Sequence, residues 1–460
     1  LAHHSREVAV VTARPLLYLP VETKARELLG KSFLAARAVE RGWIVVMGAH
    51  PDTRAFMLNH PPGIYVETSI PDVKAERLER FHRDGHRIVN MCEESVVYAE
   101  PKDYCRRKLG HTTLQLTDLL LVPGERNAEH VRTYRPEGES KIAITGNPRF
   151  DTLLPGMRRV YEREADAIRG TFGRFIVVNT NFGRPNPFRR DADPVAVLIS
   201  RGMLHEGEEA DFMRRHVSFK RWQMQGLQDL LGELAASGSV DKIVVRPHPV
   251  ENHDVWREWA KPLNIEIRFE GSANNWMLAA DAVLHPGCTT GMEGLLLDRA
   301  VFSYVPDAGS EFIGEQDRAS EWVTSASELS KGLERIRGLG QEGVRNSLAA
   351  QRARLGHSIA NVQQPYAADR ILDELEKLEI RPVQSAQIGL GSSFFAKAMR
   401  AGKKLLSPLT DAKRNERSIQ KFPGLEQEEI SEPLAQWADA GILAQVPHLT
   451  RLNPRLWALH

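Results

Sequence analysis

The chain has 460 residues, which is more than one hydrophobic core usually organises, so two domains of roughly 150–200 residues each are expected. Its 61 Lys and Arg residues balance 60 Asp and Glu residues, and this balance gives no reason to expect a nucleic acid as partner. The three cysteines, Cys92, Cys105 and Cys288, form no CxxC pair, which argues against a structural zinc site or a disulfide framework and fits a reducing cytoplasm. We find no apolar run of about 18 residues that would span a membrane and no signal peptide.

Short apolar runs alternate with amphipathic stretches over roughly the first third of the chain. The runs typical of strands lie at residues 8–12, 43–48, 63–69, 86–91, 118–124 and 141–146, and helical spacing recurs at 26–40, 72–84, 98–109 and 127–134. Strands that alternate with helices predict a parallel sheet with helices on both faces. We therefore expect an α/β, Rossmann-like domain over residues 1–155.

The same alternation begins again after a charged helix expected at residues 158–170. Further strands are expected at 175–181, 242–249, 266–271, 282–287 and 300–306, and helices at 219–236, 274–280, from 289 onward and at 325–355. This pattern predicts a second Rossmann-like, doubly wound domain over residues 171–378, facing the first across a cleft. Residues 185–215 are polar and rich in Pro and Arg, which predicts a long functional loop with some helix.

The composition changes again at about residue 379, and residues 379–460 predict a helical C-terminal extension. Within it, residues 388–409 are basic and amphipathic. Such a segment fits peripheral contact with the cytoplasmic face of an anionic inner membrane. It fits equally well a helix packed back on the N-terminal domain, and the sequence leaves both interpretations open.

Polar residues that suit chemistry follow the predicted strands directly. They are Glu93 and Glu94, Asn179 to Asn181, Arg246 to His248, and His285 to Thr290. In doubly wound sheets, ligands bind at the carboxyl ends of the strands. Two such sheets facing each other would line one cleft with all four groups.

The segment HPGCTTGMEG, residues 285–294, places a tight glycine turn between a strand and a helix. Free N–H groups at a helix start favour phosphate, so His285, Thr289 and Thr290 are candidate phosphate ligands. Glu293, one turn later, suits the hydroxyls of a ribose or a helix cap. The alternative is a plain capped helix.

The segment RPHP, residues 246–249, holds Arg246 and His248 between two prolines, with Glu251 nearby. Fixed donors of this kind suit a phosphate or a sugar carboxylate. A lone histidine is more often structural, but a second His-Pro pair recurs at the end of a later strand.

The segment CEES, residues 92–95, puts two acids after a buried strand. Glycosyl transfer needs a carboxylate as base or nucleophile, so Glu93 and Glu94 are candidates, and the sequence does not choose between them. Asn179 and Asn181 suit sugar hydroxyls or are turn residues. Arg184 suits an anionic substrate or is simply solvated.

Several other chemistries lack their motifs. No DxD follows a predicted strand, and HEGEE at residues 205–209 lacks the HExxH spacing, so no metal site is predicted. Neither GxGxxG nor a P-loop occurs, which argues against dinucleotide oxidoreductases and P-loop ATPases.

Three motifs together resemble a known family. TGNPRFD at residues 145–151 resembles the interdomain segment of bacterial surface-polymer transferases, and RPHP followed by HPGCTTGMEG resembles the paired motifs of CMP-dependent transferases. These include the retaining β-Kdo transferases of capsule and lipopolysaccharide assembly and the bacterial polysialyltransferases. CEES stands where the β-Kdo enzymes carry an acidic motif. The resemblance covers about residues 1–380.

The resemblance implies the GT-B fold and a metal-independent enzyme without cofactor that uses a CMP-activated ulosonic acid and a glycan or glycolipid acceptor. Carried over residue by residue, His248, His285, Thr289 and Thr290 would hold the CMP phosphate and Glu293 the ribose. Arg246 would meet phosphate or the sugar carboxylate, and Glu93 or Glu94 would act at the anomeric carbon or on the acceptor.

Two departures from the family pattern bear on the donor sugar and on the stereochemical outcome. Ser95 replaces the family's glycine, and Cys288 interrupts the Ser/Thr run. Four alternatives therefore stay open: a CDP-glycerol or CDP-ribitol phosphotransferase, a UDP-sugar transferase, a UDP-sugar 2-epimerase, and a non-catalytic scaffold in polysaccharide assembly.

Overall fold

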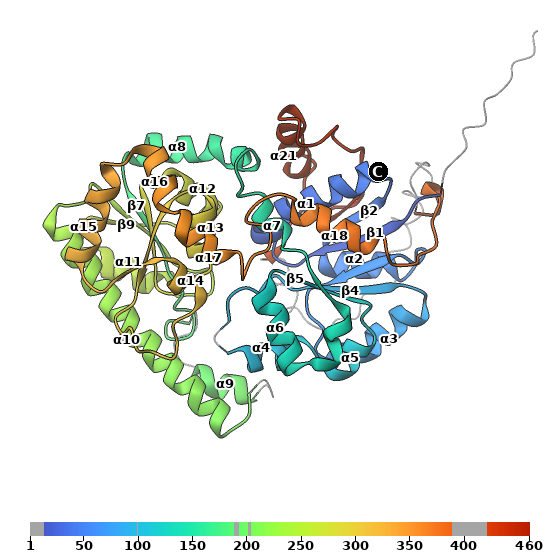
Figure 1. The fold of residues 1–460 in the computed structure, drawn as a ribbon, viewed down its shortest axis with the longest axis horizontal. Coiled ribbons are helices and arrows are strands. Elements are labelled where there is room, and N and C mark those ends of the chain that lie inside the picture. The colour runs from blue at the N-terminus through green and yellow to red at the C-terminus, as the bar shows by residue number, and fades with distance from the viewer. Residues whose placement is uncertain (1–12, 99, 188–192, 201–203, 389–420) are drawn as a thin grey trace, which may run out of the picture.

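The computed structural model describes residues 13–98, 100–187, 193–200, 204–388 and 421–460. These residues form two α/β domains that lie side by side in Figure 1, the N-terminal domain on the right and the C-terminal domain on the left. Each domain is built on one mainly parallel sheet covered by helices. The two Rossmann-like domains have the GT-B arrangement that the sequence predicts.

The N-terminal sheet has eight strands in the order β13-β14-β2-β1-β3-β4-β5-β6. Neighbours among β1 to β6 pair in parallel, whereas β14 pairs antiparallel with both β2 and β13. The strands are β1 (Leu16–Val21), β2 (Ile44–Ala49), β3 (Ile64–Glu67), β4 (Arg87–Met91), β5 (Leu119–Val122), β6 (Ile142–Ile144), β13 (Leu449–Asn453) and β14 (Leu456–Leu459).

The C-terminal sheet has six parallel strands in the order β12-β11-β10-β7-β8-β9. They are β7 (Ile176–Asn179), β8 (Ile243–Arg246), β9 (Ile265–Ile267), β10 (Ala282–His285), β11 (Ala300–Tyr304) and β12 (Glu321–Val323).

Both faces of each sheet are buried beneath helices, which explains why the strands read as continuous apolar runs. In β1, Leu17 and Leu19 pack into one core while Leu16 and Tyr18 pack into another, because successive side chains of a strand point to opposite faces. The N-terminal domain contains α1 (Lys24–Glu40), α2 (His50–Met57), α3 (Ala75–Arg83), α4 (Pro101–Lys108), α5 (His111–Gln115), α6 (Glu125–Tyr134), α7 (Pro148–Asp151), α18 (Ala367–Leu375) and α21 (Glu428–Asp439). The C-terminal domain contains α8 (Glu162–Phe172), α9 (Pro194–Ser200), α10 (Glu208–Ser237), α11 (His253–Ala260), α12 (Ala273–Ala279), α13 (Thr290–Leu296), α14 (Glu315–Ala319), α15 (Ala326–Arg337), α16 (Gly340–Ser347) and α17 (Ala349–Leu355).

The chain crosses between the domains twice, once after β6 and once before α18. Residues 145–151, which we call the pivot, lie at the first crossing and form hydrogen bonds to the second. Asn361 donates to Asp151 at 2.7 Å and to the backbone carbonyl of Asn147 at 3.1 Å. The carboxylate of Asp151 accepts the first two backbone N–H groups of α18 at 2.8 and 3.0 Å. Gly146 has a φ of 85°, and a Cβ there would collide with Asn361, so the pivot requires glycine.

The C-terminal extension differs from its prediction. It is not purely helical, because β13 and β14 add an antiparallel hairpin to the edge of the N-terminal sheet. Leu434 and Trp437 of α21 are fully buried in the core of the N-terminal domain. The basic segment was predicted over 388–409; its residues 389–409 lie outside the described residues, so both interpretations of it stay predictions.

Other element predictions need correction. The strand expected at 8–12 lies outside the described residues, and β1 instead occupies 16–21. The long helix expected at 325–355 is three helices: Gly338 and Gly340, whose φ is 61°, separate α15 from α16, and a second break at Leu348 separates α16 from α17. Helix α18 packs in the N-terminal core, so the chain returns to the N-terminal domain before residue 378, the predicted end of the C-terminal domain.

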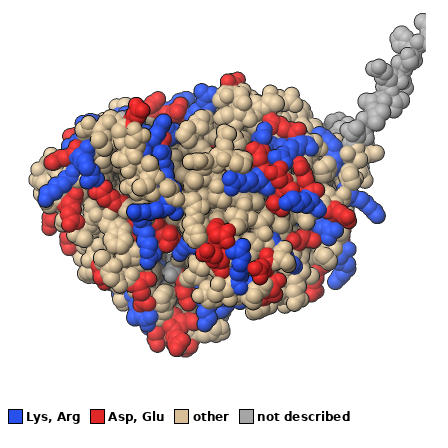
Figure 2. Space-filling model, in the orientation of Figure 1, with Lys and Arg blue, Asp and Glu red and all other residues tan. Residues whose placement is uncertain are grey.

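Basic and acidic side chains are interspersed over both domains on the face shown in Figure 2. In the part of the chain that the structure describes, none of the helices combines the length and the apolar character needed to cross a membrane.

Candidate functional site

The strand orders define one switch point in each sheet, where consecutive connections run in opposite directions. In the N-terminal sheet it lies between β1 and β3, and in the C-terminal sheet between β7 and β10. Crevices at the carboxyl ends of such strands are where doubly wound sheets bind ligands. The predicted groups Asn179 to Asn181 and His285 to Thr290 follow the two strands of the second switch point.

Contacts between the domains show that the carboxyl edges of the two sheets face each other. His248, after β8, lies within electrostatic range of Arg26 and Glu94 of the N-terminal domain. Ion pairs also join the domains at these edges, among them Arg106 with Glu209 at 3.2 Å, Arg126 with Glu315 at 3.8 Å, and Arg149 with Glu293 at 3.6 Å. We call this shared region the interdomain face.

Glu93 is buried and held in place at the end of β4. Its Oε2 accepts a hydrogen bond from Asn147 of the pivot at 3.0 Å, and its Oε1 lies 3.6 Å from the Lys31 ammonium. Lys31 also donates to Glu27 at 2.8 Å and to the carbonyl of Pro20 at 2.7 Å. Burial opposes the charge on Lys31, but Glu27 and Glu93 raise its pKa above the ordinary value. A cation thus stays beside Glu93 at neutral pH.

Glu94 points the other way. Its side chain is 54% exposed and pairs with Lys108 at 2.6 Å and with Arg26 at 3.7 Å. Burial alone would raise the pKa of Glu94, but Lys108 and Arg26 lower it below the ordinary value. The two candidate acids therefore differ: Glu93 is fixed in a buried network, and Glu94 forms ion pairs at the surface.

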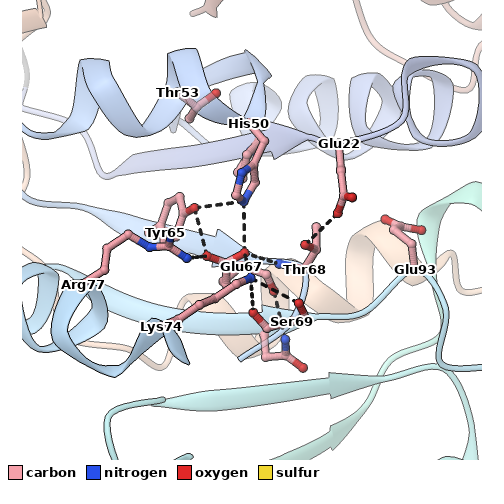
Figure 3. A network of polar contacts seen from close by, with 12 residues as sticks. Glu22, His50, Thr53, Tyr65, Glu67, Thr68, Ser69, Lys74, Arg77 and Glu93 are labelled. Atoms are coloured by element: carbon pink, nitrogen blue, oxygen red, sulfur yellow. Dashed lines mark hydrogen bonds and ion pairs between the residues drawn. The ribbon is translucent and has the colours of Figure 1, made fainter. Parts of the chain in front are cut away.

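A third acid, Glu67, lies at the N-terminal switch point and is absent from the residues that the sequence predicts. It ends β3 with its side chain fully buried. It accepts hydrogen bonds from His50 at 3.0 Å, Tyr65 at 3.3 Å, Lys74 at 3.0 Å and Arg77 at 3.2 Å (Figure 3). Burial alone would raise the pKa of Glu67, but His50, Lys74 and Arg77 hold it far below the ordinary value.

The Glu67 cluster extends toward the end of β1. Thr68 donates through its hydroxyl to Glu22 at 3.3 Å, and Lys421 pairs with Glu22 at 2.6 Å (Figure 3 shows the first contact). The sequence signal that could have found Glu67 is an acid at the carboxyl end of a buried strand, close to the signal that identifies Glu93. The signal is weaker at Glu67, because it is a single acid and its partners come from separate segments.

His285 is fully buried, and the turn around it takes both of its ring nitrogens. Nδ1 accepts the backbone N–H groups of Gly287 at 3.1 Å and Cys288 at 3.2 Å, so Nε2 carries the proton and faces Ser320 Oγ at 2.9 Å. Burial lowers the pKa of His285 to about 4, so the ring is neutral. A Cβ on Gly291 would clash with it. His285 therefore shapes the turn and does not fit direct contact with phosphate.

Arg246 and Glu251 are also occupied within the domain, contrary to their predicted role in donor binding. Arg246 is buried, and its guanidinium donates to the carbonyls of Glu270 at 2.8 Å and Gly271 at 3.1 Å. Glu251 is fully buried and accepts from Trp256 at 2.7 Å, besides bonds within the loops after β7 and β8. Glu251 thus holds these two loops together, and Arg246 ties the end of β8 to the segment after β9.

His248 keeps a position suited to a ligand. The ring is exposed at the interdomain face, and Nδ1 accepts the backbone N–H of Val250 at 3.3 Å. Nε2 is then the protonated nitrogen, and it has no protein partner in the described ranges. Desolvation by nearby protein lowers the pKa of His248, and Glu251 opposes this shift.

The asparagines after β7 also differ from each other. Asn181 donates to the carbonyl of Gly287 at 2.9 Å and so ties the two loops of the switch point together. Asn179 is buried, and its Nδ2 has no hydrogen-bond partner among the described residues. An unpaired buried donor of this kind is rare and costly, and a bound ligand would satisfy it.

Thr289, Thr290 and Glu293 sit at the start of α13, where the sequence placed them. Both threonines are half-buried, and Thr290 lies against the Cys288 thiol. Glu293 lies in the first turn, and its carboxylate faces Arg149 of the pivot at 3.6 Å. A ribose at Glu293 would have to share that carboxylate with Arg149.

Arg184 lies in the loop after β7, and the structure places basic neighbours around it. Its Nη1 is 3.4 Å from Nδ1 of His216 on α10. Lys220, one turn further along α10, is buried and donates to the carbonyl of Pro286 at 2.7 Å. The sequence predicts a role for neither His216 nor Lys220, because single basic residues on a long helix give no signal.

Within the described ranges, the His, Cys, Asp and Glu residues form no group of three or more that would hold a metal ion. No known protein family and no curated protein matches the chain significantly.

Solved structures with a similar fold include the wall teichoic acid polymerase TagF, 14% identical over 80% of this chain and 89% of that chain, with a TM-score of 0.49. Two others are MnaA of S. aureus solved with UDP (13%, 81% and 100%, TM-score 0.46) and the UDP-GlcNAc 2-epimerase of Methanocaldococcus jannaschii (12%, 79% and 99%, TM-score 0.45). At such low identity the likeness concerns fold and not chemistry.

Proposed function

We propose that this chain is a glycosyltransferase of bacterial surface polysaccharide synthesis. It transfers an ulosonic acid, Kdo or a related sugar, from a CMP-activated donor to a glycan or glycolipid acceptor without a metal. One observation carries the proposal: the carboxyl edges of the two sheets face each other, with Arg149 against Glu293 and His248 near Arg26, and Asn179 at the C-terminal switch point keeps a buried, unpaired donor that a ligand would satisfy.

In this proposal the C-terminal domain holds the donor. His248 offers Nε2–H to the phosphate, Thr289 and Thr290 line the start of α13, and Asn179 donates to a ligand oxygen. His285 acts indirectly, since it fixes the turn that carries the two threonines. Donors held by the fold before the substrate arrives cost little reorganisation in the reaction.

Glu93 is the proposed reacting carboxylate, as base or nucleophile, because Asn147 and Lys31 fix its orientation. Glu94 is exposed and neutralised by Lys108, which suits a role at the rim. The matched pair Glu93→Gln and Glu94→Gln separates these roles. We expect Glu93→Gln to lower turnover by about 10²–10⁴-fold with CMP binding intact, and Glu94→Gln to lower it far less. The reverse result would assign the chemistry to Glu94.

The nucleotide is tested first, by thermal shift with CMP, CDP, UMP, UDP and GDP. A ligand at one hundred times its dissociation constant stabilises the fold by about 2.7 kcal/mol. We expect a shift with CMP that His248→Ala removes. A preference for UDP would favour a UDP-sugar transferase or epimerase, and a preference for CDP would favour a phosphotransferase. No response to any nucleotide would favour the scaffold.

A further inference from the structure

The C-terminal side of the interdomain face gathers basic side chains around the turn after β10. Arg184 lies against His216, and Lys220, one turn further along α10, donates to the turn itself through the carbonyl of Pro286. Lys220 lies directly behind the turn, since a Cβ on Gly287 would come within 3.1 Å of its Nζ. We call Arg184, His216 and Lys220, with Arg107 opposite, the basic cluster.

The positive charge of this cluster is poorly compensated. Burial, with Arg184 and Lys220, lowers the pKa of His216 to about 3, so its ring is neutral and accepts from Arg184. Asp317 is the main acid facing Lys220, whose pKa burial lowers to about 8. In the described part of the chain, no carboxylate lies at ion-pair distance from the Arg184 guanidinium.

A second guanidinium lies near Arg184 on the other domain, because α4 contacts α10 through the ion pair of Arg106 with Glu209 at 3.2 Å and Arg107 is the next residue of α4. Burial and then Arg107, on α4, lower the pKa of Arg184, while Asp103 opposes them. Arg107 binds Asp103 through Nη2 at 2.6 Å, but its Nε is buried and has no partner among the described residues. Two like charges thus lie within electrostatic range of each other across the domain boundary, and one of them keeps a free donor.

We propose that Arg184 and Arg107 together bind the carboxylate of the donor sugar, at a site separate from the nucleotide phosphate. An anion between the two guanidiniums removes their repulsion and pairs the free donor of Arg107. The planar fork of arginine matches a carboxylate in two parallel hydrogen bonds. The sugar class rests on the proposed function, but the anion site does not.

Inorganic sulfate is the first probe, titrated by thermal shift at constant ionic strength, with and without saturating CMP. We expect sulfate to stabilise the wild type and to bind at least tenfold more weakly to Arg184→Gln and to Arg107→Gln. The loss of binding in the double variant should be smaller than the sum of the two single losses, because both side chains hold one ion. The matched control is Arg215→Gln, an exposed arginine of α10 paired with Glu311 at 3.0 Å, which should bind like the wild type.

Free Kdo and its methyl ester are the second pair of probes. Kdo should displace sulfate from the wild type and the ester should not, since the ester lacks the carboxylate. The proposal would be overturned if Arg184→Gln bound sulfate as tightly as the wild type, or if the ester displaced sulfate as well as the acid does. Sulfate that competes with CMP would overturn the separation of the two sites.

The two proposals fail in different ways. If CMP does not bind but sulfate and Kdo bind through Arg184, the anion site stands and the CMP-dependent function falls. If CMP binds and Arg184→Gln changes nothing, the function stands and the anion site falls. An unfolding transition of Arg184→Gln like that of the wild type shows that the variant is folded.

Discussion

The two carboxyl edges at the interdomain face differ in how their buried charges are compensated. On the N-terminal edge, Glu67 and Glu93 are buried acids with cations or amides already bound to them. On the C-terminal edge, Arg184 and Lys220 are cations with few acids near them. A satisfied network needs no ligand to be stable, whereas an under-compensated one is stabilised by an anion. The first edge is therefore built to position groups, and the second to receive charge.

The largest effect that tests this comparison is expected from Glu67→Ala. This change leaves His50, Lys74 and Arg77 around an empty site, and breaking a buried ion pair in this way costs about 3–5 kcal/mol. Urea unfolding measures the loss. The control is Glu79→Ala, an exposed acid of α3, which should stay within about 0.5 kcal/mol of the wild type. A small loss of unfolding free energy in Glu67→Ala would show that the cations of the cluster do not depend on Glu67 for compensation.

A middle-sized effect is expected at the pivot that joins the two edges. Asp151→Asn replaces one acceptor of a backbone N–H by an amide N–H₂, and leaving that buried donor unpaired costs about 1–3 kcal/mol. Urea unfolding at pH 7 measures this loss.

The same residue gives a pH dependence. Burial raises the pKa of Asp151 to about 7, above that of the unfolded chain. Between the two pKa values only the folded state holds the proton, so this group stabilises less as pH rises toward 7. The advantage of the wild type over Asp151→Asn should therefore be smaller at pH 7 than at pH 5. An advantage that grows with pH would contradict the raised pKa.

The smallest effect is expected from Arg184→Met without ligand. Because Arg184 has little compensating charge, its removal should change the free energy of unfolding by less than about 1 kcal/mol, in the stabilising direction. Added sulfate should then stabilise the wild type and not the variant. A marked loss of stability would mean that the C-terminal edge is as satisfied as the N-terminal one.

The sequence by itself determined the two parallel sheets. Each strand is buried on both faces and so reads as a short apolar run, and helices of amphipathic spacing separate these runs. It also placed polar residues at the strand ends, which the parallel order brings to one edge. Glu93, Asn181, His248 and Thr289 lie at the carboxyl ends of their strands for that reason.

Only the tertiary structure decided which of these side chains remain free. His285, Arg246 and Glu251 bind backbone groups of their own or neighbouring loops, because buried polar groups must be paired and the loop path sets the nearest partner. The edge hairpin of β13 and β14 and the pair Arg107 and Arg184 join segments that lie far apart in the chain, and the Glu67 cluster joins side chains from separate elements between residues 50 and 77. Their contacts depend on packing and leave no local pattern in the sequence.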